Sequence, residues 1–316
     1  MEWTNTTLVE EFILKGFTGG PVFQAFIFTA LLLVYIIILS GNVFIIVIIS
    51  SDYRLHSPMY FFLSCLSFIE ILAVSTVIPE LLAVTVTEKR TISRAGCHTQ
   101  IYFYYFSFTT DFFILTVMSF NRYLAVCHPL RYSSIMINSL CIKLAGGSLL
   151  TSSSCILISL MLRINIPFCS RVLNHFFCDG SAVLKLACVD VRVIKRNEII
   201  ISVFILIGCL LLTAVSYSLI VFTVIRIPSK EGRHKTFSTC VSHLVMVIIV
   251  FGSAIFINIR PPKDYSVTET DRVVNLLSTI LAPLLNPFIY TLRNEKVKNC
   301  IRDAKNRCFN NFCFRA

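Results

Sequence analysis

Two acidic side chains interrupt long apolar stretches of this sequence, and they are its first candidates for chemistry. Glu70 stands in "FFLSCLSFIEILAVSTV" and Asp111 in "YFYYFSFTTDFFILTVMSF". A carboxylate inside a bilayer costs roughly a few kcal/mol at least and usually marks a functional site. Two such groups at one depth can share a proton or bind a cation, with coupled titration.

The spacing of these acids places them at a similar depth. Glu70 lies 12 residues after Pro58, and Asp111 lies 11 residues before Arg122. In helices, both then stand about 17 Å above the inner surface. We expect a shared polar site at Glu70 and Asp111, a candidate sodium site, which Asn42 and Asn286 could complete with further oxygens. The alternative is that each acid is simply protonated and hydrogen-bonded.

One helical face joins Asp111 to both ends of its segment, because offsets of 4, 7, 11, 14 and 18 residues share a face. Tyr104 to Arg122 spans about 27 Å on this face, which is close to the hydrocarbon thickness. The face therefore runs from an aromatic outer end to an arginine at the inner rim. Its members are Tyr104, Phe108, Asp111, Leu115, Met118 and Arg122.

The composition is that of a membrane protein. Of 316 residues, 56% are hydrophobic and only 14% are charged, whereas a soluble domain carries roughly a quarter charged residues. We predict an all-α membrane protein, a bundle of seven transmembrane helices in one domain (23–292). An N-terminal segment (1–22) precedes the bundle, and a tail (293–316) with a short cytosolic amphipathic helix follows it. The helices are expected near 23–50, 58–84, 98–126, 140–163, 197–226, 236–259 and 272–292.

Three observations orient this bundle with its N-terminus outside. Lys and Arg are slightly more numerous on the C-terminal side, as the positive-inside rule requires. Asn5 opens an N-glycosylation acceptor, which must be lumenal. Four cysteines suited to disulfides fall on the N-terminal side. The net charge of +11 then lies mostly beside anionic lipid on the cytosolic face.

The same four cysteines mark a long outer loop at 164–196. Cys97 precedes the third helix, and Cys169, Cys178 and Cys188 lie in the loop. Four cysteines allow three pairings, and their spacing does not choose among them. A loop bridged to Cys97 either forms a lid or only stabilises the fold.

The C-terminal part of the chain carries two further features. Pro283 and Pro287 each remove a helical hydrogen bond, and Asn286 between them can satisfy a freed backbone group. The kink is either static or a hinge, and we favour the hinge. In the tail, cysteines beside basic residues are candidates for acylation or remain plain thiols: Cys300, Cys308 and Cys313.

Several stretches, in order and at fixed spacing, carry a resemblance to a known family. The chain resembles the vertebrate olfactory receptors of the rhodopsin-like G-protein-coupled class, tetrapod type, over nearly its whole length. The stretches are "GN" (41–42), "LHSPMYFFLSCLSFIEI" (55–71), "SFNRYLAVCHPLRY" (119–132), "SY" (216–217), "KTFSTCVSHLVMV" (235–247) and "PLLNPFIYTLRNEKVK" (283–298).

The resemblance implies an odorant receptor at the plasma membrane that couples to the olfactory stimulatory G protein and raises cyclic AMP. It implies the pairs Cys97–Cys178 and Cys169–Cys188, and a cation site at Glu70 and Asp111. Neither an enzymatic activity nor a nucleic-acid partner is expected. The implied coupling and switch residues are Asn121, Arg122, Tyr123, Tyr217, His243, Asn286, Pro287 and Tyr290.

At three positions the chain departs from the family pattern. Asn121 replaces the usual aspartate beside Arg122, which puts basal activity in doubt. Glu70 stands where aspartate is commoner. Phe251 replaces the usual tyrosine and removes a hydroxyl from the pocket floor.

Periodicity and resemblance together predict a ligand pocket for a small volatile apolar molecule. Its lining is mostly aromatic and aliphatic with a few hydrogen-bonding groups, as in small-molecule sites generally. The alternative for each residue is core packing. The predicted lining is Tyr104, Tyr105, Phe108, Thr109, Ile201, Ser202, Ile205, Phe251, Ala254, Ile255, Asn258, Leu276 and Thr279.

Other classes fit the sequence less well. An ion or proton transporter would use the intramembrane acids, but the chain lacks an internal repeat. An intramembrane enzyme would need a catalytic motif, and neither H-E-x-x-H nor G-x-S-x-G is present. A receptor for a peptide or amine is disfavoured by the apolar pocket. A receptor for a non-odorant metabolite outside the nose remains an alternative.

Overall fold

Seven long helices form the body of the protein in this computed structural model, which describes residues 9–15, 17, 19–87, 91–259, 269–293 and 297–303. Their bounds are α1 Pro21–Ser51, α2 Pro58–Val86, α3 Arg94–Cys127, α5 Asn138–Arg163, α7 Arg192–Ile225, α8 Lys230–Ile259 and α9 Glu269–Arg293. Six of them are long and apolar enough to cross a membrane, and α8 contains a shorter apolar stretch, Cys240–Phe256. The predicted seven-helix bundle is therefore confirmed.

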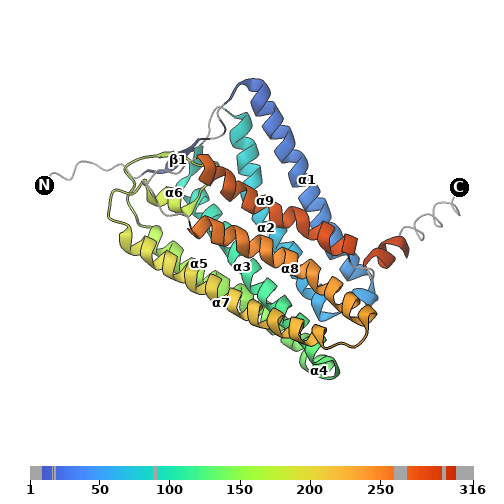
Figure 1. The fold of residues 1–316 in the computed structure, drawn as a ribbon. Helices are drawn as coiled ribbons and strands as arrows, with labels where there is room; N and C mark the ends of the chain where they lie inside the picture. Colours follow the sequence, from blue (N-terminus) through green and yellow to red (C-terminus); the bar gives the residue numbers. More distant parts are fainter. Residues whose placement is uncertain are drawn as a thin grey trace, which may run out of the picture.

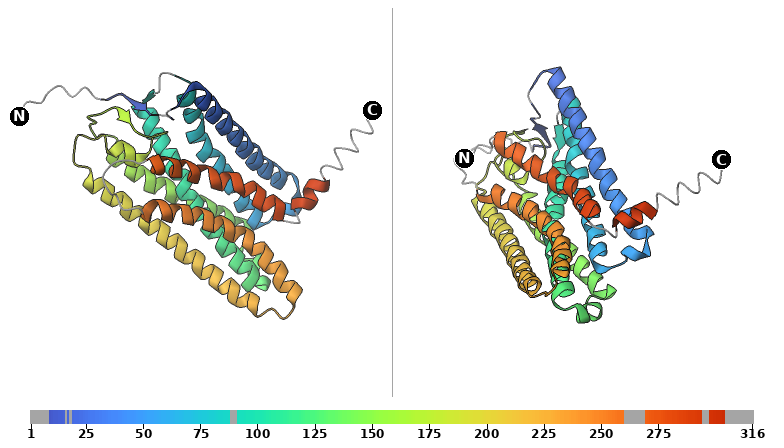
Figure 2. Two further views of the ribbon diagram at one scale, coloured as in Figure 1. Left: turned by 45° about the horizontal axis from the view of Figure 1, so that its top comes forward. Right: turned by 45° about the vertical axis from the view of Figure 1, so that its right-hand side comes forward.

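Short elements mark the two ends of the bundle (Figure 1). At the end we call the sheet end lie the strands β1 Glu11–Leu14, β2 Thr91–Ser93 and β3 Val172–Leu173, and the helix α6 Gly180–Leu184. At the other end, the α4 end, lie the 3-10 turn η1 Tyr53–Leu55, the helix α4 Pro129–Ile135 and a helical segment at 297–303. Figure 2 shows the same separation from two further sides.

A small sheet that was not predicted accompanies the helical bundle. Its strand order is β2-β1-β3, with β1 antiparallel to β2 and parallel to β3. These strands are four, three and two residues long, too short for a pattern that would predict them. They pair because backbone groups close to a packed core need hydrogen-bond partners.

Local sequence explains where several helices begin. Proline at the first helical position starts α1, α2 and α4, where its missing N–H costs nothing. Ser93 caps α3 by accepting a hydrogen bond from the Gly96 N–H at 3.1 Å. Beyond the expected apolar limits, α3, α7 and α8 start earlier, at Arg94, Arg192 and Lys230. Polar turns continue these helices, so hydropathy alone underestimates their length.

The helix α3 is the most central one. It packs against α2, α5, α7 and α8, and both Figures 1 and 2 show it inside the bundle. At another contact, a Cβ added to Gly41 of α1 would lie 3.0 Å from the Pro287 ring of α9. Glycine at this position therefore permits the close approach of α1 to α9.

Candidate functional site

The loop between α5 and α7 does not only cover the bundle but enters it. Disulfides join Cys97 to Cys178 and Cys169 to Cys188, the pairing that the resemblance implied. Residues 175–179, which we call the inserted segment, are all at most 4% exposed. The Cys178 N–H donates to Gln100 Oε1 at 2.8 Å, and Gln100 Nε2 donates to the Thr76 carbonyl at 2.8 Å. The loop is thus tied to both α3 and α2.

Asp179 is the polar centre of the inserted segment. Its Oδ1 accepts from the N–H groups of Ser181 and Ala182, both at 3.0 Å, and so caps α6. Its Oδ2 accepts from the Tyr105 hydroxyl at 2.9 Å. Burial alone would raise the pKa of Asp179, but the nearby His175 and these hydrogen bonds outweigh burial and lower it. Asp179 therefore stays ionised and fixes the Tyr105 ring.

An aromatic column descends from the inserted segment into the bundle. Ring centroids are 5.1 Å apart between Phe177 and Tyr104, and 6.3 Å between Tyr104 and Phe108. The next two separations, Phe108 to Phe112 and Phe112 to Phe251, are both 5.0 Å. These five residues, the aromatic column, connect the loop through α3 to α8. Phe112 was not predicted, although it lies four residues after Phe108 and so on the same face.

The remaining predicted pocket residues divide by burial. Thr279 is buried, and its hydroxyl donates to the Tyr104 oxygen at 3.4 Å, which links α9 to the column. Ser202 is exposed, although we predicted that it faces inward. It shares a helical face with Glu198, whose ion pair with Arg163 occupies the neighbouring turn of α7. The side chain of Asn258 lies outside the described residues. Buried members are Thr109, Ala254 and Leu276, and half-buried ones are Ile201, Ile205 and Ile255.

Below the column lies a buried polar cluster between α1, α2, α3 and α9. The Asn286 side chain donates to Glu70 Oε2 at 2.9 Å. Asn42 donates to the carbonyl of Pro283 at 3.1 Å, at one of the two prolines inside the continuous helix α9. Asp111 is close enough to Glu70 for electrostatic interaction. One side-chain oxygen each of Asp111, Asn42 and Asn286 has no hydrogen-bond partner among the described residues. The cluster is therefore rich in uncommitted oxygen.

Near the α4 end, three of the predicted switch residues, Tyr217, His243 and Tyr290, are close enough to Arg122 for electrostatic interaction. The Tyr217 hydroxyl lies 2.6 Å from His243 Nδ1, and it donates to the Cys240 carbonyl at 3.3 Å. Within the described part of the chain, the Arg122 Nε and the Tyr290 hydroxyl are buried without hydrogen-bond partners. Because some of these polar groups lack hydrogen-bond partners in the described arrangement, the group can exchange partners when the helices move.

The neighbouring residues Asn121 and Tyr123 have other contacts. Asn121 is 1% exposed; its oxygen accepts from the Tyr132 hydroxyl of α4 at 3.0 Å. Its amide lies 3.5 Å from the Met59 sulfur. The Tyr123 hydroxyl lies 3.0 Å from His128 Nε2. The contact from Asn121 to α4 was not predicted from the sequence, because no periodicity places Tyr132 opposite it.

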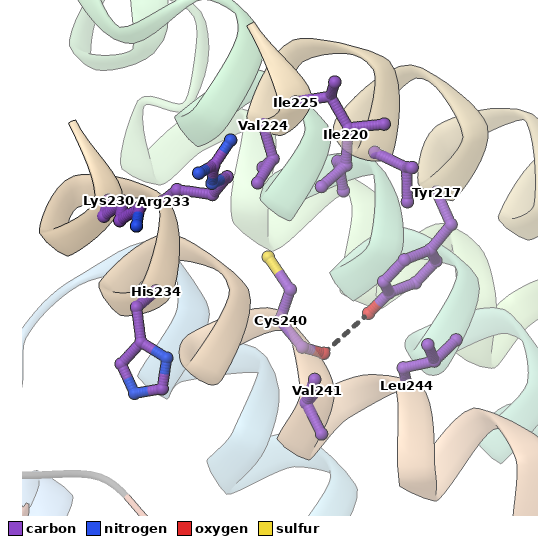
Figure 3. Close-up of a pocket in the computed structure, with 11 residues that line it drawn as sticks. Tyr217, Ile220, Val224, Ile225, Lys230, Arg233, His234, Cys240, Val241 and Leu244 are labelled. Carbon is purple, nitrogen blue, oxygen red and sulfur yellow. Dashed lines mark hydrogen bonds between the residues drawn. The ribbon is translucent and has the colours of Figure 1, made fainter. Parts of the chain in front are cut away.

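A cavity of about 530 Å³ opens between α7 and α8 at this end. Figure 3 shows Cys240 and Leu244 of α8 facing Tyr217 and Ile220 of α7 across it. Lys230, Arg233 and His234 add basic groups to its lining, which is otherwise largely apolar. The cavity suits an amphipathic segment with negative charge.

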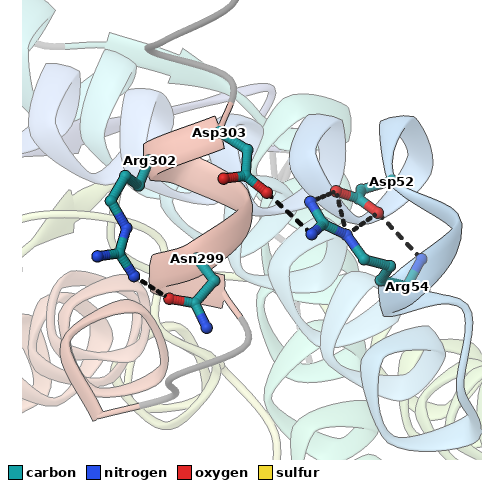
Figure 4. A network of polar contacts seen from close by, with 5 residues as sticks. All are labelled: Asp52, Arg54, Asn299, Arg302 and Asp303. Atoms are coloured by element: carbon teal, nitrogen blue, oxygen red, sulfur yellow. Dashed lines mark hydrogen bonds and ion pairs between the residues drawn. The ribbon is translucent and has the colours of Figure 1, made fainter.

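A polar contact fixes the segment 297–303 beside η1, as Figure 4 shows. Arg54 pairs with Asp52 at 2.7 Å and with Asp303 at 2.9 Å. Hydrogen bonds from Arg54 hold the pKa of Asp52 well below its usual range. Cys300 is only 4% exposed on this segment, so its thiol is poorly placed for acylation. Asn5, Cys308 and Cys313 lie outside the described residues.

Comparison with known proteins identifies the chain. The family model described as olfactory receptor matches residues 31–307. Human olfactory receptor 6S1 is 43% identical over 300 residues, covering 93% of this chain and 89% of the relative. Human olfactory receptor 6X1 is 43% identical over 301 residues (95% and 96%), and mouse olfactory receptor 6E1 is 42% identical over 300 residues (95% and 96%). The protein is a multi-pass membrane receptor and not an enzyme. The chain belongs to the olfactory receptor family.

Proposed function

We propose that the protein binds a small volatile apolar molecule at the sheet end of the bundle and activates a stimulatory G protein at the α4 end. In this proposal the sheet end is extracellular, the α4 end is cytosolic, and the receptor resides in the plasma membrane and raises cyclic AMP. The aromatic column carries the proposal, because it links the inserted segment to α8, the helix that borders the cavity at the α4 end.

The ligand would lie beside this column. Aromatic faces attract apolar molecules, and hydroxyl groups of Tyr104 and Thr279 offer directed hydrogen bonds. A ligand that displaces Phe108 or Phe251 would shift α8 relative to α3. The cavity between α7 and α8 would then admit a segment of the G protein, with Arg122 as its central polar contact.

A matched pair of substitutions tests the pocket. A cyclic AMP reporter in cells that express the chain would first identify an active volatile compound. Phe108→Ala should then raise the half-maximal concentration by about tenfold or more, the equivalent of about 1.4 kcal/mol. Phe106→Ala is the control, because Phe106 is half-buried on the same helix but stacks on Tyr102, away from the column. Equal effects of the two variants at matched surface levels would contradict the pocket.

The proposed function includes a sodium ion held by Glu70 and Asp111. The uncommitted oxygens of Asp111, Asn42 and Asn286 suit such an ion, which prefers oxygen ligands. Bound there, the ion would supply positive charge beside two buried carboxyl groups. Loss of sodium-dependent basal signalling in Asp111→Asn, with sodium dependence present in the unaltered receptor, is the expected result.

A further inference from the structure

A second cavity lies on the flank of the bundle between α3 and α5, near the sheet end. It measures about 740 Å³ and is not formed by the aromatic column. Arg94, His98, Tyr102 and Phe103 line it from α3, and Leu157 and Leu160 line it from α5. Tyr102 lies about 200° around the helix from Tyr104. The two cavity walls are fastened below by a hydrogen bond of 2.8 Å between the Tyr102 and Ser153 hydroxyls.

His98 is the polar side chain that this cavity leaves uncommitted. It is only 5% exposed, and neither of its ring nitrogens has a hydrogen-bond partner in the described part of the chain. A neutral imidazole has one donor and one acceptor nitrogen, and the tautomer decides which is which. A hydroxyl group can bond either nitrogen in either tautomer, because it both donates and accepts. Both nitrogens are buried, so the imidazole ring has to turn toward the cavity to meet a ligand, and a hydroxyl group is then its best partner.

The charges at the cavity do not select an ionic ligand. Arg94 and Glu10 both line the mouth and carry opposite charges. Arg94 Nη2 donates to the carbonyls of Ile164 and Ile166 at 2.6 and 3.0 Å. Arg163, on the neighbouring turn of α5, is paired with Glu198. A neutral ligand is the best match to this balance.

The position of the cavity indicates where such a ligand comes from. Phe103 and Leu157 are 36% and 39% exposed on membrane-spanning helices, so the cavity opens sideways toward lipid. His98 is one helical turn, about 6 Å, below Arg94 at the start of α3. The apolar walls continue from there toward the bilayer centre. We propose that this cavity binds a membrane sterol, with the sterol hydroxyl on His98 and the ring system along Tyr102, Phe103 and Leu157.

A sterol fits these features because it carries one hydroxyl at the membrane surface on a rigid apolar body. Animal plasma membranes are rich in sterol. The inference rests on the proposed orientation, with the sheet end in the outer leaflet. Its readout is binding and not signalling, so it fails or succeeds separately from the proposed receptor activity.

The test uses the full-length receptor in lipid nanodiscs that contain a photoreactive cholesterol analogue. After irradiation, we expect labelled peptides from 94–103 and 157–164. His98→Phe should lower this labelling by about tenfold, which corresponds to about 1.4 kcal/mol. Unlabelled cholesterol should compete about tenfold better than cholestane, which lacks the hydroxyl.

Two substitutions on α5 keep the test decisive if His98→Phe does not fold. Leu157→Trp fills the cavity and should abolish labelling at both peptides. Leu150→Trp is its matched control, two turns away on the same face and 71% exposed to lipid, and should leave labelling unchanged. Unchanged labelling in folded His98→Phe, or equal competition by cholestane, would overturn the hydroxyl contact. Absence of labelling at both peptides in the unaltered receptor would overturn the sterol as occupant.

Discussion

The inserted segment and the cavity between α7 and α8 are held in opposite ways. The inserted segment has a disulfide at Cys178, and hydrogen bonds join it to Gln100 and Tyr105. Across the cavity, Tyr217 supplies the hydrogen bonds to α8 that the structure describes, at His243 and Cys240. Several independent anchors make one arrangement stable, whereas a single polar contact can be exchanged at low cost. We expect the sheet end to keep its shape while the α4 end rearranges.

The largest expected effect is loss of the inserted segment's covalent anchor. Cys97→Ser and Cys178→Ser should each abolish surface expression or ligand response. A bridge of this kind contributes about 2–5 kcal/mol, which is a large part of a domain's stability. Surface staining and reporter output measure the effect, with Cys155→Ser as a control because Cys155 is a free cysteine. Normal signalling from both variants would show that the anchor is dispensable.

Arg122 tests the other side of the comparison. Arg122→Ala should remove evoked cyclic AMP while the receptor remains at the cell surface, because the Arg122 Nε has no hydrogen bond to lose among the described residues. Arg122→Lys should retain part of the response, since it keeps the charge without the planar fork. If Arg122→Ala instead disappears from the surface, the residue is structural.

Asp179→Ala tests whether the hydrogen bonds of Asp179 hold the inserted segment rigid. The substitution removes the cap of α6 and the acceptor of Tyr105, with an expected cost of about 1–3 kcal/mol. The thermal midpoint of purified receptor should fall accordingly. Because the pKa of Asp179 is lowered in the folded state, its contribution is fully present above the unfolded pKa. It is lost only as pH falls through the lower, folded pKa.

In the unaltered receptor, the contribution of Asp179 to the stability of the folded state should therefore stay constant between pH 5 and 8. Asp190→Ala is the control, because Asp190 is exposed and, among the described residues, bonds only Arg192, two positions along the chain. An equal drop in both variants would mean that the Asp179 contacts do not hold the segment.

The polar cluster between the two regions should respond as one unit. Glu70→Gln and Asp111→Asn should each change basal or evoked signalling and its dependence on sodium or pH. The double variant should deviate from additivity by about 0.5–3 kcal/mol, as groups in one network do. Strict additivity with unaltered ion dependence would separate the two acids.

The smallest expected effect is at Asn121. An aspartate there would keep the hydrogen bond from Tyr132 and strengthen it by charge, and it would add an acid beside Arg122. An ion pair near a surface is worth roughly 0–1 kcal/mol. Asn121→Asp should therefore lower basal cyclic AMP by at most about fivefold, with odorant affinity little changed. Tyr132→Phe should raise basal cyclic AMP. Identical basal cyclic AMP in the unaltered receptor, Asn121→Asp and Tyr132→Phe would show that the contact between residues 121 and 132 does not affect signalling.

Particular residues show how far sequence reasoning reaches. The apolar stretches predict all seven helices, and one helical face predicts that Tyr104 and Phe108 lie together. The inserted segment could not be predicted, because Phe177 and Asp179 lie in a loop without periodicity and are buried only through long-range contacts. Ser202 shows the opposite failure. Its helical spacing placed it on the predicted inward face of α7, but no other helix in the described part of the chain packs over that turn, so its side chain is exposed. Cys300 looked available beside basic residues, yet its segment packs against η1.

The close approach of Gly41 to Pro287 has a mechanical consequence. Asn42, the next residue, is hydrogen-bonded to the Pro283 carbonyl, so α1 contacts α9 at both of the prolines inside that helix. Any rotation of α9 against α1 would then be centred on this contact. Tyr290 lies only three residues, about 4.5 Å, beyond Pro287. Because Tyr290 is so close to the centre of rotation, a small rotation of α9 would move its side chain by only a small distance. A methyl group on residue 41 would push α9 away from α1 and so displace the centre of rotation itself.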